Sequence, residues 1–124
     1  TTLALDDSTP GQTVREIAGP MGIEVRPDLE PERGLLRRSD HWPFMQRGVP
    51  AVSFLFGFDP GAEAEARYRD WYQNRYHAPQ DDVTTPIDFQ AQADFHRFYF
   101  ALTEAVANAD EPPQWLPESP NRPR

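Results

Sequence analysis

The stretch RSDHWPFMQRGVPAVSFLFG, residues 38–57, decides the fold, because a polar turn gives way there to an apolar run. Residues 49–56 are almost wholly apolar, which is typical of a central strand covered on both faces. Just ahead of them, residues 40–48 predict a short helical turn with Asp40 as its N-cap and Gly48 as its C-terminal stop. The sequence thus predicts a turn that delivers the chain into the middle of a sheet.

Upstream of this stretch, the sequence predicts one helix and one strand. The helix begins near Thr9, ends at residues 19–22, and carries an apolar stripe at helical spacing formed by Val14, Ile17, Ala18 and Met21. IEVRP, residues 23–27, predicts a short strand that Pro27 closes. Residues 27–40 contain two prolines and a glycine, so we expect a connecting loop.

Downstream, the sequence predicts a second helix and a tail. Residues 58–75 have helix-forming composition but also fit a surface excursion, and the pattern leaves both open. A long helix is predicted over about residues 87–109, with Asp88 in its first turn. Residues 110–124 are proline-rich and polar, so we expect an extended tail in which Trp115 is the one residue that docks.

Strands that alternate with helices predict an α/β layered fold. Two predicted strands make a poor independent core, so the pattern is typical of the second half of a larger α/β domain. We expect residues 1–109 to form that portion and residues 110–124 to form the tail.

The composition narrows the classes of function. The 124 residues suit one domain, and the formal net charge of −8 argues against nucleic acid and anionic membranes as partners. No apolar run approaches the roughly 20 residues that span a bilayer. The opening residues do not have the pattern of a signal peptide, so the compartment stays open, and an exported parent would carry its signal outside this sequence. There is no cysteine, so His, Asp or Glu would have to hold any metal ion.

Two segments carry candidate site residues. In NRYHAPQDD, residues 74–82, His77 is either a metal ligand or a turn histidine beside a packed tyrosine, and spacing alone leaves both open. Tyr76 could donate its hydroxyl to a developing oxyanion, and Asp81 or Asp82 could hold the loop. His96 reads as an ordinary helix residue.

The other segment is RRSDH, at residues 37–41. Its Arg37 and Arg38 either bind a substrate carboxylate or are simply solvated. The sequence contains no Gly-rich phosphate loop, HExxH or GxSxG pattern.

Taken together, PERGLLRRSDHWPFMQRGVPAVSFLFG and, downstream, RYHAPQDD resemble the carboxy-terminal part of the zinc aminopeptidases of peptidase family M28. The resemblance runs from about Val14 to Trp115. It implies a three-layer α/β/α fold around a mixed sheet, and a site with two zinc ions that acts on peptide substrates.

The resemblance also implies roles for individual residues. His77 matches a histidine that ligates one zinc ion, and Tyr76 matches a tyrosine that helps to stabilise the oxyanion. Asp81 matches a supporting aspartate of the same loop. Arg38, Ser39, Asp40 and His41 match a segment that lies near the site and shapes it, without a ligand role for His41.

The chain departs from the family pattern in the other ligands. The family's HxD segment and adjacent glutamate pair do not occur in this sequence. We therefore expect the carboxy-terminal part of a zinc aminopeptidase that is inactive in isolation. The alternatives are a non-catalytic interaction module derived from the same fold and, with less support from Tyr76, a glutaminyl-cyclase-like acyltransferase. Because a partial sheet leaves strand edges uncovered, we also expect a homodimer formed by edge pairing or strand exchange.

Overall fold

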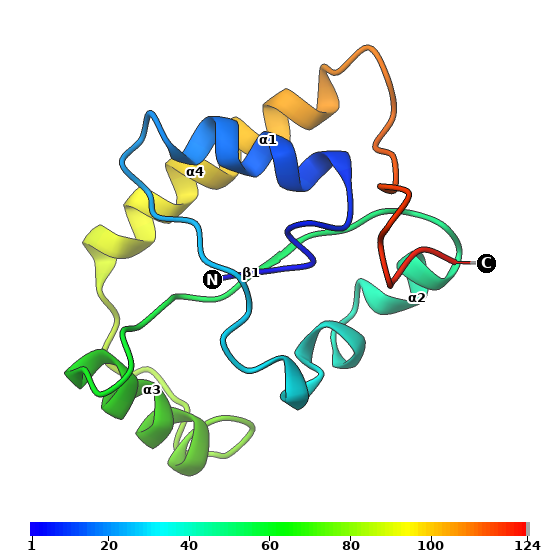
Figure 1. Ribbon diagram of the computed structural model, residues 1–124. Helices are drawn as coiled ribbons and strands as arrows, with labels where there is room; N and C mark the ends of the chain where they lie inside the picture. The colour runs from blue at the N-terminus through cyan, green and yellow to red at the C-terminus, as the bar shows by residue number, and fades with distance from the viewer. Residues whose placement is uncertain (124) are drawn as a thin grey trace.

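The computed structural model describes residues 1–123 and combines helices with a small antiparallel sheet (Figure 1). In chain order the elements are β1 (Thr2–Leu3), α1 (Thr9–Ala18), two 3-10 turns η1 (Pro31–Arg33) and η2 (Leu35–Arg38), α2 (Trp42–Gln46), β2 (Ser53–Phe54), α3 (Glu63–Asn74) and α4 (Phe89–Ala107). No helix in the described part of the chain is both long enough and apolar enough to cross a membrane.

The core forms where α1 and α4 lie side by side and face the sheet (Figure 1). Both helices were predicted, and each contributes its apolar stripe to one buried cluster of Leu5, Val14, Ala18, Phe98 and Leu102. Phe54 of β2 meets the ring of Phe98 edge-on, with the ring centroids 5.4 Å apart. The helix pair therefore covers one face of the sheet.

The sheet is smaller than the sequence predicted. β1 pairs antiparallel with β2, Thr2 opposite Phe54 and Leu3 opposite Ser53. The prediction of a strand at residues 23–27 is wrong, because the segment is not a strand in the structure. It accepts a single backbone hydrogen bond from β1, from the Thr2 N–H to the Arg26 carbonyl at 2.8 Å. Pro27 has no N–H with which to continue the pairing.

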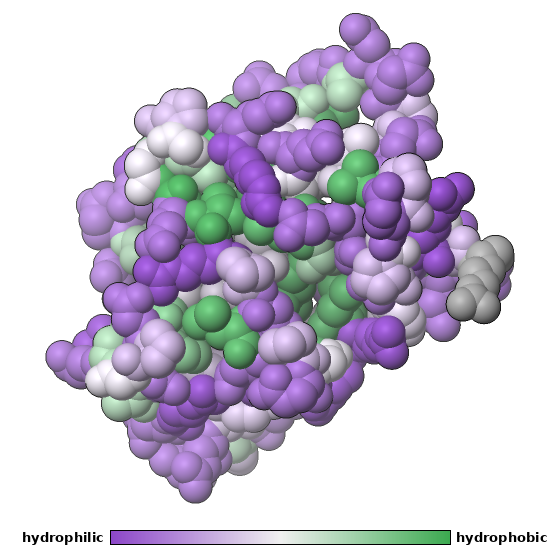
Figure 2. All heavy atoms as spheres, viewed as in Figure 1, coloured by the Kyte–Doolittle hydropathy of each residue, from purple (hydrophilic) through white to green (hydrophobic). Residues whose placement is uncertain are grey.

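The prediction of a central strand over residues 49–56 is also wrong in its length and its burial. β2 has two residues, and Val49 and Phe56 are 52% and 62% exposed. Thr1 and Leu55 exchange both backbone bonds at 2.9 Å, so the main-chain groups of Phe54 and Phe56 face away from β1. Within residues 1–123 no strand lies along this second edge. Figure 2, drawn from the same direction as Figure 1, shows apolar residues at the surface in the middle of the molecule.

The turn at residues 40–48 forms, but its cap differs. His41, not Asp40, is the N-cap residue of α2, because the His41 carbonyl accepts the first helical bond, from the Met45 N–H at 3.1 Å. Gly48 ends the turn at a φ of +89°, a conformation that glycine adopts without strain.

The remaining elements resolve what the pattern left open. Within residues 58–75 the chain forms a helix, α3, over Glu63–Asn74, and the predicted loop at 27–40 contains the two 3-10 turns. α4 begins where its first turn was predicted, because the Asp88 carboxylate accepts the N–H groups of Gln90 and Ala91 at 3.0 and 2.9 Å.

The tail folds back over the start of the chain (Figure 1). The indole N–H of Trp115 donates to the Gly48 carbonyl at 2.8 Å, which confirms that this residue docks. The prediction that it is the one tail residue to dock is wrong, because the Asp7 carboxylate also accepts hydrogen bonds from Ser119 and Asn121 at 2.9 and 2.8 Å. The division of the chain at residue 109 stays a prediction.

Candidate functional site

The candidate histidine follows the end of α3. The backbone N–H groups of Arg75 and Tyr76 both donate to the Trp71 carbonyl, each at 2.9 Å, which widens and closes the last turn of the helix. His77 then adopts a φ of +58°, in the left-handed region that residues with a Cβ rarely enter. The helix end and this single residue together turn the chain into the loop that contains Pro79.

Hydrogen bonds to α3 brace the loop. The Asp81 carboxylate accepts from the Trp71 indole N–H at 3.2 Å and from the Thr85 hydroxyl at 3.1 Å. The guanidinium of Arg75 donates to the Gln80 carbonyl at 2.9 Å. Asp81 therefore fastens the loop to the helix, and it makes no hydrogen bond to the His77 ring.

Asp82 forms a second, local turn. Its carboxylate accepts from the N–H and the hydroxyl of Thr84 at 2.8 and 2.7 Å. These bonds hold the pKa of the exposed Asp82 carboxyl below its usual value, with the Thr84 hydroxyl as the larger cause. Asp82 stays charged at neutral pH, and its role in this structure is to shape the turn.

The rings of Tyr76 and His77 are stacked. Their centroids lie 3.9 Å apart with 21° between the planes, and both residues are exposed. Tyr76 also stacks on Tyr72, at 4.9 Å and 15°. In the described part of the chain neither nitrogen of His77 has a hydrogen-bond partner, so the ring is held by its face and its nitrogens stay open.

The RSDH segment lies at the end of η2 and the start of α2. Arg38 and Asp40 are exposed, and the Ser39 hydroxyl donates to the Leu35 carbonyl at 2.8 Å. His41 is half-buried, and its Nε2 atom is buried without a partner among residues 1–123. Burial lowers the pKa of His41, against the opposing effects of the Leu36 backbone and the Asp40 charge.

The two segments do not form one site in this chain. No hydrogen bond, ion pair or ring contact joins the RSDH segment to the Tyr76–Asp81 loop in the region that the structure describes. Nor do any three His, Asp or Glu side chains of residues 1–123 converge as a metal site would need. A zinc site takes three or four protein ligands, so the donors present do not fit a complete one.

The residues of α3 and η1 that stack beneath Tyr76 were not identified from the sequence. Tyr68, Tyr72 and Tyr76 recur every fourth residue, which places them on one face of α3 and its final turn. Arg33 of η1 lies against this face, with its guanidinium carbon 4.4 Å from the centroid of the Tyr72 ring. The four-residue spacing of the tyrosines was the available signal.

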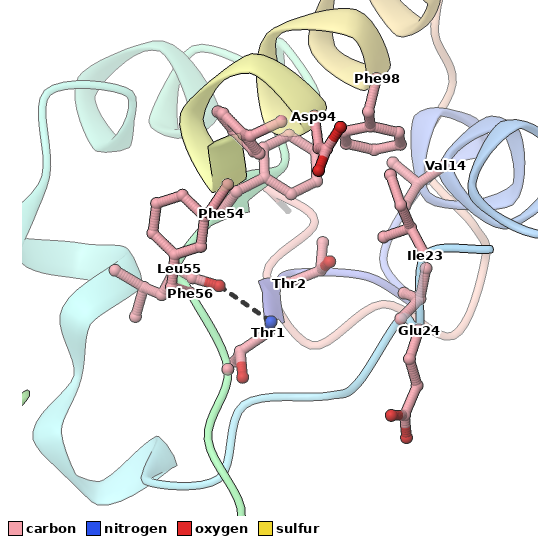
Figure 3. Close-up of a pocket in the computed structure, with 14 residues that line it drawn as sticks. Thr1, Thr2, Val14, Ile23, Glu24, Phe54, Leu55, Phe56, Asp94 and Phe98 are labelled. Atoms are coloured by element: carbon pink, nitrogen blue, oxygen red, sulfur yellow. Dashed lines mark hydrogen bonds between the residues drawn. The ribbon is translucent and has the colours of Figure 1, made fainter. Parts of the chain in front are cut away.

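A cavity of about 320 Å³ lies elsewhere, between β1, the segment at residues 23–25 and α4 (Figure 3). Its walls are mainly apolar, and include Val14, Phe54 and Phe98. None of the predicted site residues lines it. The cavity is therefore separate from the candidate loop.

Comparison with known proteins identifies the family. The family model described as Peptidase family M28 matches residues 3–103. No curated protein and no solved structure matches the chain. The match covers most of the 124 residues and includes both the RSDH segment and the Tyr76–Asp81 loop. The chain therefore belongs to peptidase family M28.

Proposed function

We propose that this chain is the carboxy-terminal part of a zinc-dependent aminopeptidase that hydrolyses the N-terminal peptide bond of peptide substrates, and that the chain is inactive alone. Family membership supports the peptidase class, and members of this family are generally zinc-dependent. The observation that carries the proposal is the exposed His77 ring, stacked on Tyr76 in a loop that Asp81 fastens to α3.

The proposal extends to the fold of the whole domain. α1 and α4 cover one face of the short sheet, and the second edge of β2 is free of pairing in the described residues. These features suit one side of a three-layer α/β/α domain, in which further strands continue the sheet past β2 and other helices cover its second face.

Each candidate residue then has a proposed role. His77 would supply one imidazole ligand to zinc, and Tyr76 would offer its hydroxyl to the oxyanion of the reacting peptide bond. Arg38 and Asp40, both exposed, would face the substrate from the second segment. The remaining ligands and the general base would come from polypeptide outside this chain, because the donors present here do not fit a complete zinc site.

A zinc titration tests the isolated chain. We expect calorimetry at neutral pH to show negligible binding by the chain and by its His77→Ala variant, because one imidazole does not make a zinc site. We also expect no metal-dependent release of an N-terminal residue from a peptide. Tight zinc binding that His77→Ala abolishes, or such release, would contradict inactivity in isolation.

The site assignment needs a longer version of the protein that includes polypeptide preceding this chain. There we expect zinc-dependent aminopeptidase activity, and we expect His77→Ala to reduce kcat/KM by at least about 100-fold. His96→Ala is the matched control, since His96 is an exposed histidine on α4 and should leave activity unchanged. Full activity with His77→Ala would refute the role of His77. A longer protein with neither an HxD segment nor a glutamate pair would favour the interaction module instead.

A further inference from the structure

Four side chains form a continuous stack that starts in η1 and ends at His77. The guanidinium carbon of Arg33 lies 4.4 Å from the Tyr72 ring centroid. Tyr72 stacks on Tyr76 at 4.9 Å, and Tyr76 stacks on His77 at 3.9 Å. The ring planes differ by 15° at the first of these contacts and by 21° at the second, so the three rings are close to parallel.

The last contact depends on the backbone of His77. Side chains of neighbouring residues point in different directions in both helices and strands, so adjacent rings do not normally stack. The left-handed φ of +58° at His77 turns its imidazole back over the ring of Tyr76. A residue with a Cβ adopts this conformation only where its surroundings enforce it. Here the braces from Asp81 to Trp71 and Thr85 hold the loop in that turn.

Hydrogen bonds and ion pairs hold Arg33, the first residue of the stack. One guanidinium nitrogen of Arg33 donates to the Glu30 carboxylate and to the Tyr68 hydroxyl, each at 2.8 Å. Glu30 also binds Arg69 of α3 at 2.7 Å. The side chains of Arg33 and Glu30 are only 18% and 21% exposed, so water screens this network less than an ordinary surface ion pair. A flat guanidinium held in this way can lie against the Tyr72 ring, which an ammonium group cannot do in the same geometry.

We propose that Arg33 and Tyr72 are positioning residues for His77 and Tyr76, and that the stack sets the direction in which the imidazole nitrogens and the Tyr76 hydroxyl are presented. This inference rests on the proposed function for its role in a zinc site. The groups that orient a metal-binding histidine contribute about 10- to 100-fold to metal affinity. The usual orienting group is a carboxylate or a carbonyl that bonds to the second ring nitrogen, and His77 has neither within the described residues. Stacking of its ring on Tyr76 would orient the imidazole instead.

The stack is testable on the chain as it stands. A histidine held over a tyrosine ring has imidazole proton resonances displaced by the ring current, and His77→Gln assigns them in the NMR spectrum. We expect Tyr72→Leu and Arg33→Ala to move the His77 resonances toward those of the exposed His96. Tyr72→Phe, which keeps the ring, should leave them in place, and so should Tyr99→Leu, which removes an exposed tyrosine from α4.

Far-UV circular dichroism must show that each variant is folded. If Arg33→Ala does not fold, Arg33→Lys replaces it, because lysine keeps the charge beside Glu30 but has no flat group to lie on Tyr72. Unmoved His77 resonances in folded Tyr72→Leu and in the folded Arg33 variant would overturn the inference.

A second measurement separates this inference from the proposed function. In the longer, zinc-binding version of the protein, Tyr72→Leu should weaken zinc binding by about 10- to 100-fold, whereas Tyr72→Phe should bind zinc as tightly as the wild type. If His77→Ala abolishes zinc binding while Tyr72→Leu has no effect, the proposed function stands and the positioning role falls. If the longer protein binds no zinc but the His77 resonances are displaced, the stacked arrangement is confirmed. The proposed function and the role of the stack in a zinc site are then both refuted.

Discussion

At the scale of single residues, two buried side-chain polar atoms have no partner in the described part of the chain, the Ser8 hydroxyl oxygen and His41 Nε2. A buried polar group without a hydrogen bond costs about 1–3 kcal/mol of folding free energy. For His41 the consequence depends on pH, because burial opposes the charged imidazolium and lowers the pKa of this residue in the folded state. The groups that act against this shift are the Leu36 backbone and the Asp40 charge.

We predict that the free energy of unfolding falls as the pH drops from about 7.5 to 5.5. An unfolded histidine has a pKa near 6.5. With a lower pKa in the folded state, His41 takes up its proton more readily in the unfolded chain, so stability is full above about pH 6.5 and is lost as the pH falls toward the folded pKa. Urea unfolding at several pH values measures this loss.

The control for this prediction is a pair of histidine variants. His41→Phe should reduce the pH dependence, whereas His96→Gln, at an exposed position on α4, should retain it. Burial also lowers the pKa of the Thr1 ammonium group, which leaves part of the slope in both variants. Glu24, Glu30 and Glu65 have carboxyl pKa values lowered below 4.5 by their hydrogen-bond partners, so they titrate below this window. The same pH slope in His41→Phe as in the wild type would contradict the assignment.

At the scale of elements, the chain that leads into α1 passes very close to the first turn of the helix. A Cβ placed on Gly11 would lie 1.7 Å from the Leu5 carbonyl oxygen. Leu5 belongs to the buried cluster, and Asp7 is buried and accepts two bonds from the tail, so neither can move away freely. Glycine is needed here for close approach and not for an unusual φ.

We predict that Gly11→Ala destabilises the fold by about 2 kcal/mol or more, although alanine is the better helix former by about 1 kcal/mol. The added methyl group forces the helix and the Leu5 backbone apart. Chemical denaturation gives the difference, and Gln12→Ala, at the exposed neighbouring position, should change stability by no more than about 0.5 kcal/mol. A Gly11→Ala variant as stable as the wild type would show that the approach is looser than this structure has it.

At the scale of the whole molecule, the second edge of β2 has no partner strand within residues 1–123. Phe56, which follows β2 in the chain, is 62% exposed. An unpaired edge with apolar side chains tends to pair with another chain. We propose that the isolated chain self-associates by antiparallel pairing or exchange of this edge.

The predicted homodimer should be weak at low salt and stronger at high salt. Each copy has a formal net charge of −8, so the copies repel, and salt screens that repulsion. Light scattering at about 50 mM and 500 mM salt should show the dimer fraction rising. Phe56→Lys should abolish it, and Val83→Lys, at a fully exposed loop position away from β2, should not. A monomer at every salt concentration would exclude the dimer.

Much of this protein could be predicted from local sequence. The helices α1 and α4 follow from apolar periodicity, the start of α4 from Asp88, and the docking of Trp115 from its place in a polar tail. The family follows from motifs whose order and spacing are properties of the sequence itself. The same motifs locate Tyr76, His77 and Asp81 in one loop. The roles assigned to these three residues stay predictions.

The rest depends on partners distant in the sequence. A strand exists only where another strand pairs with it. The apolar run at residues 49–56 therefore forms a strand of only two residues. Its partner is Thr2–Leu3, which has no strand pattern of its own. Arg33 reaches Tyr68 across 35 positions, and the contact of His77 with Tyr76 needs the left-handed turn that the loop's hydrogen bonds impose. Periodicity and motif spacing record which side chains are available. Their burial, stacking and pKa depend on which segments the folded chain brings together.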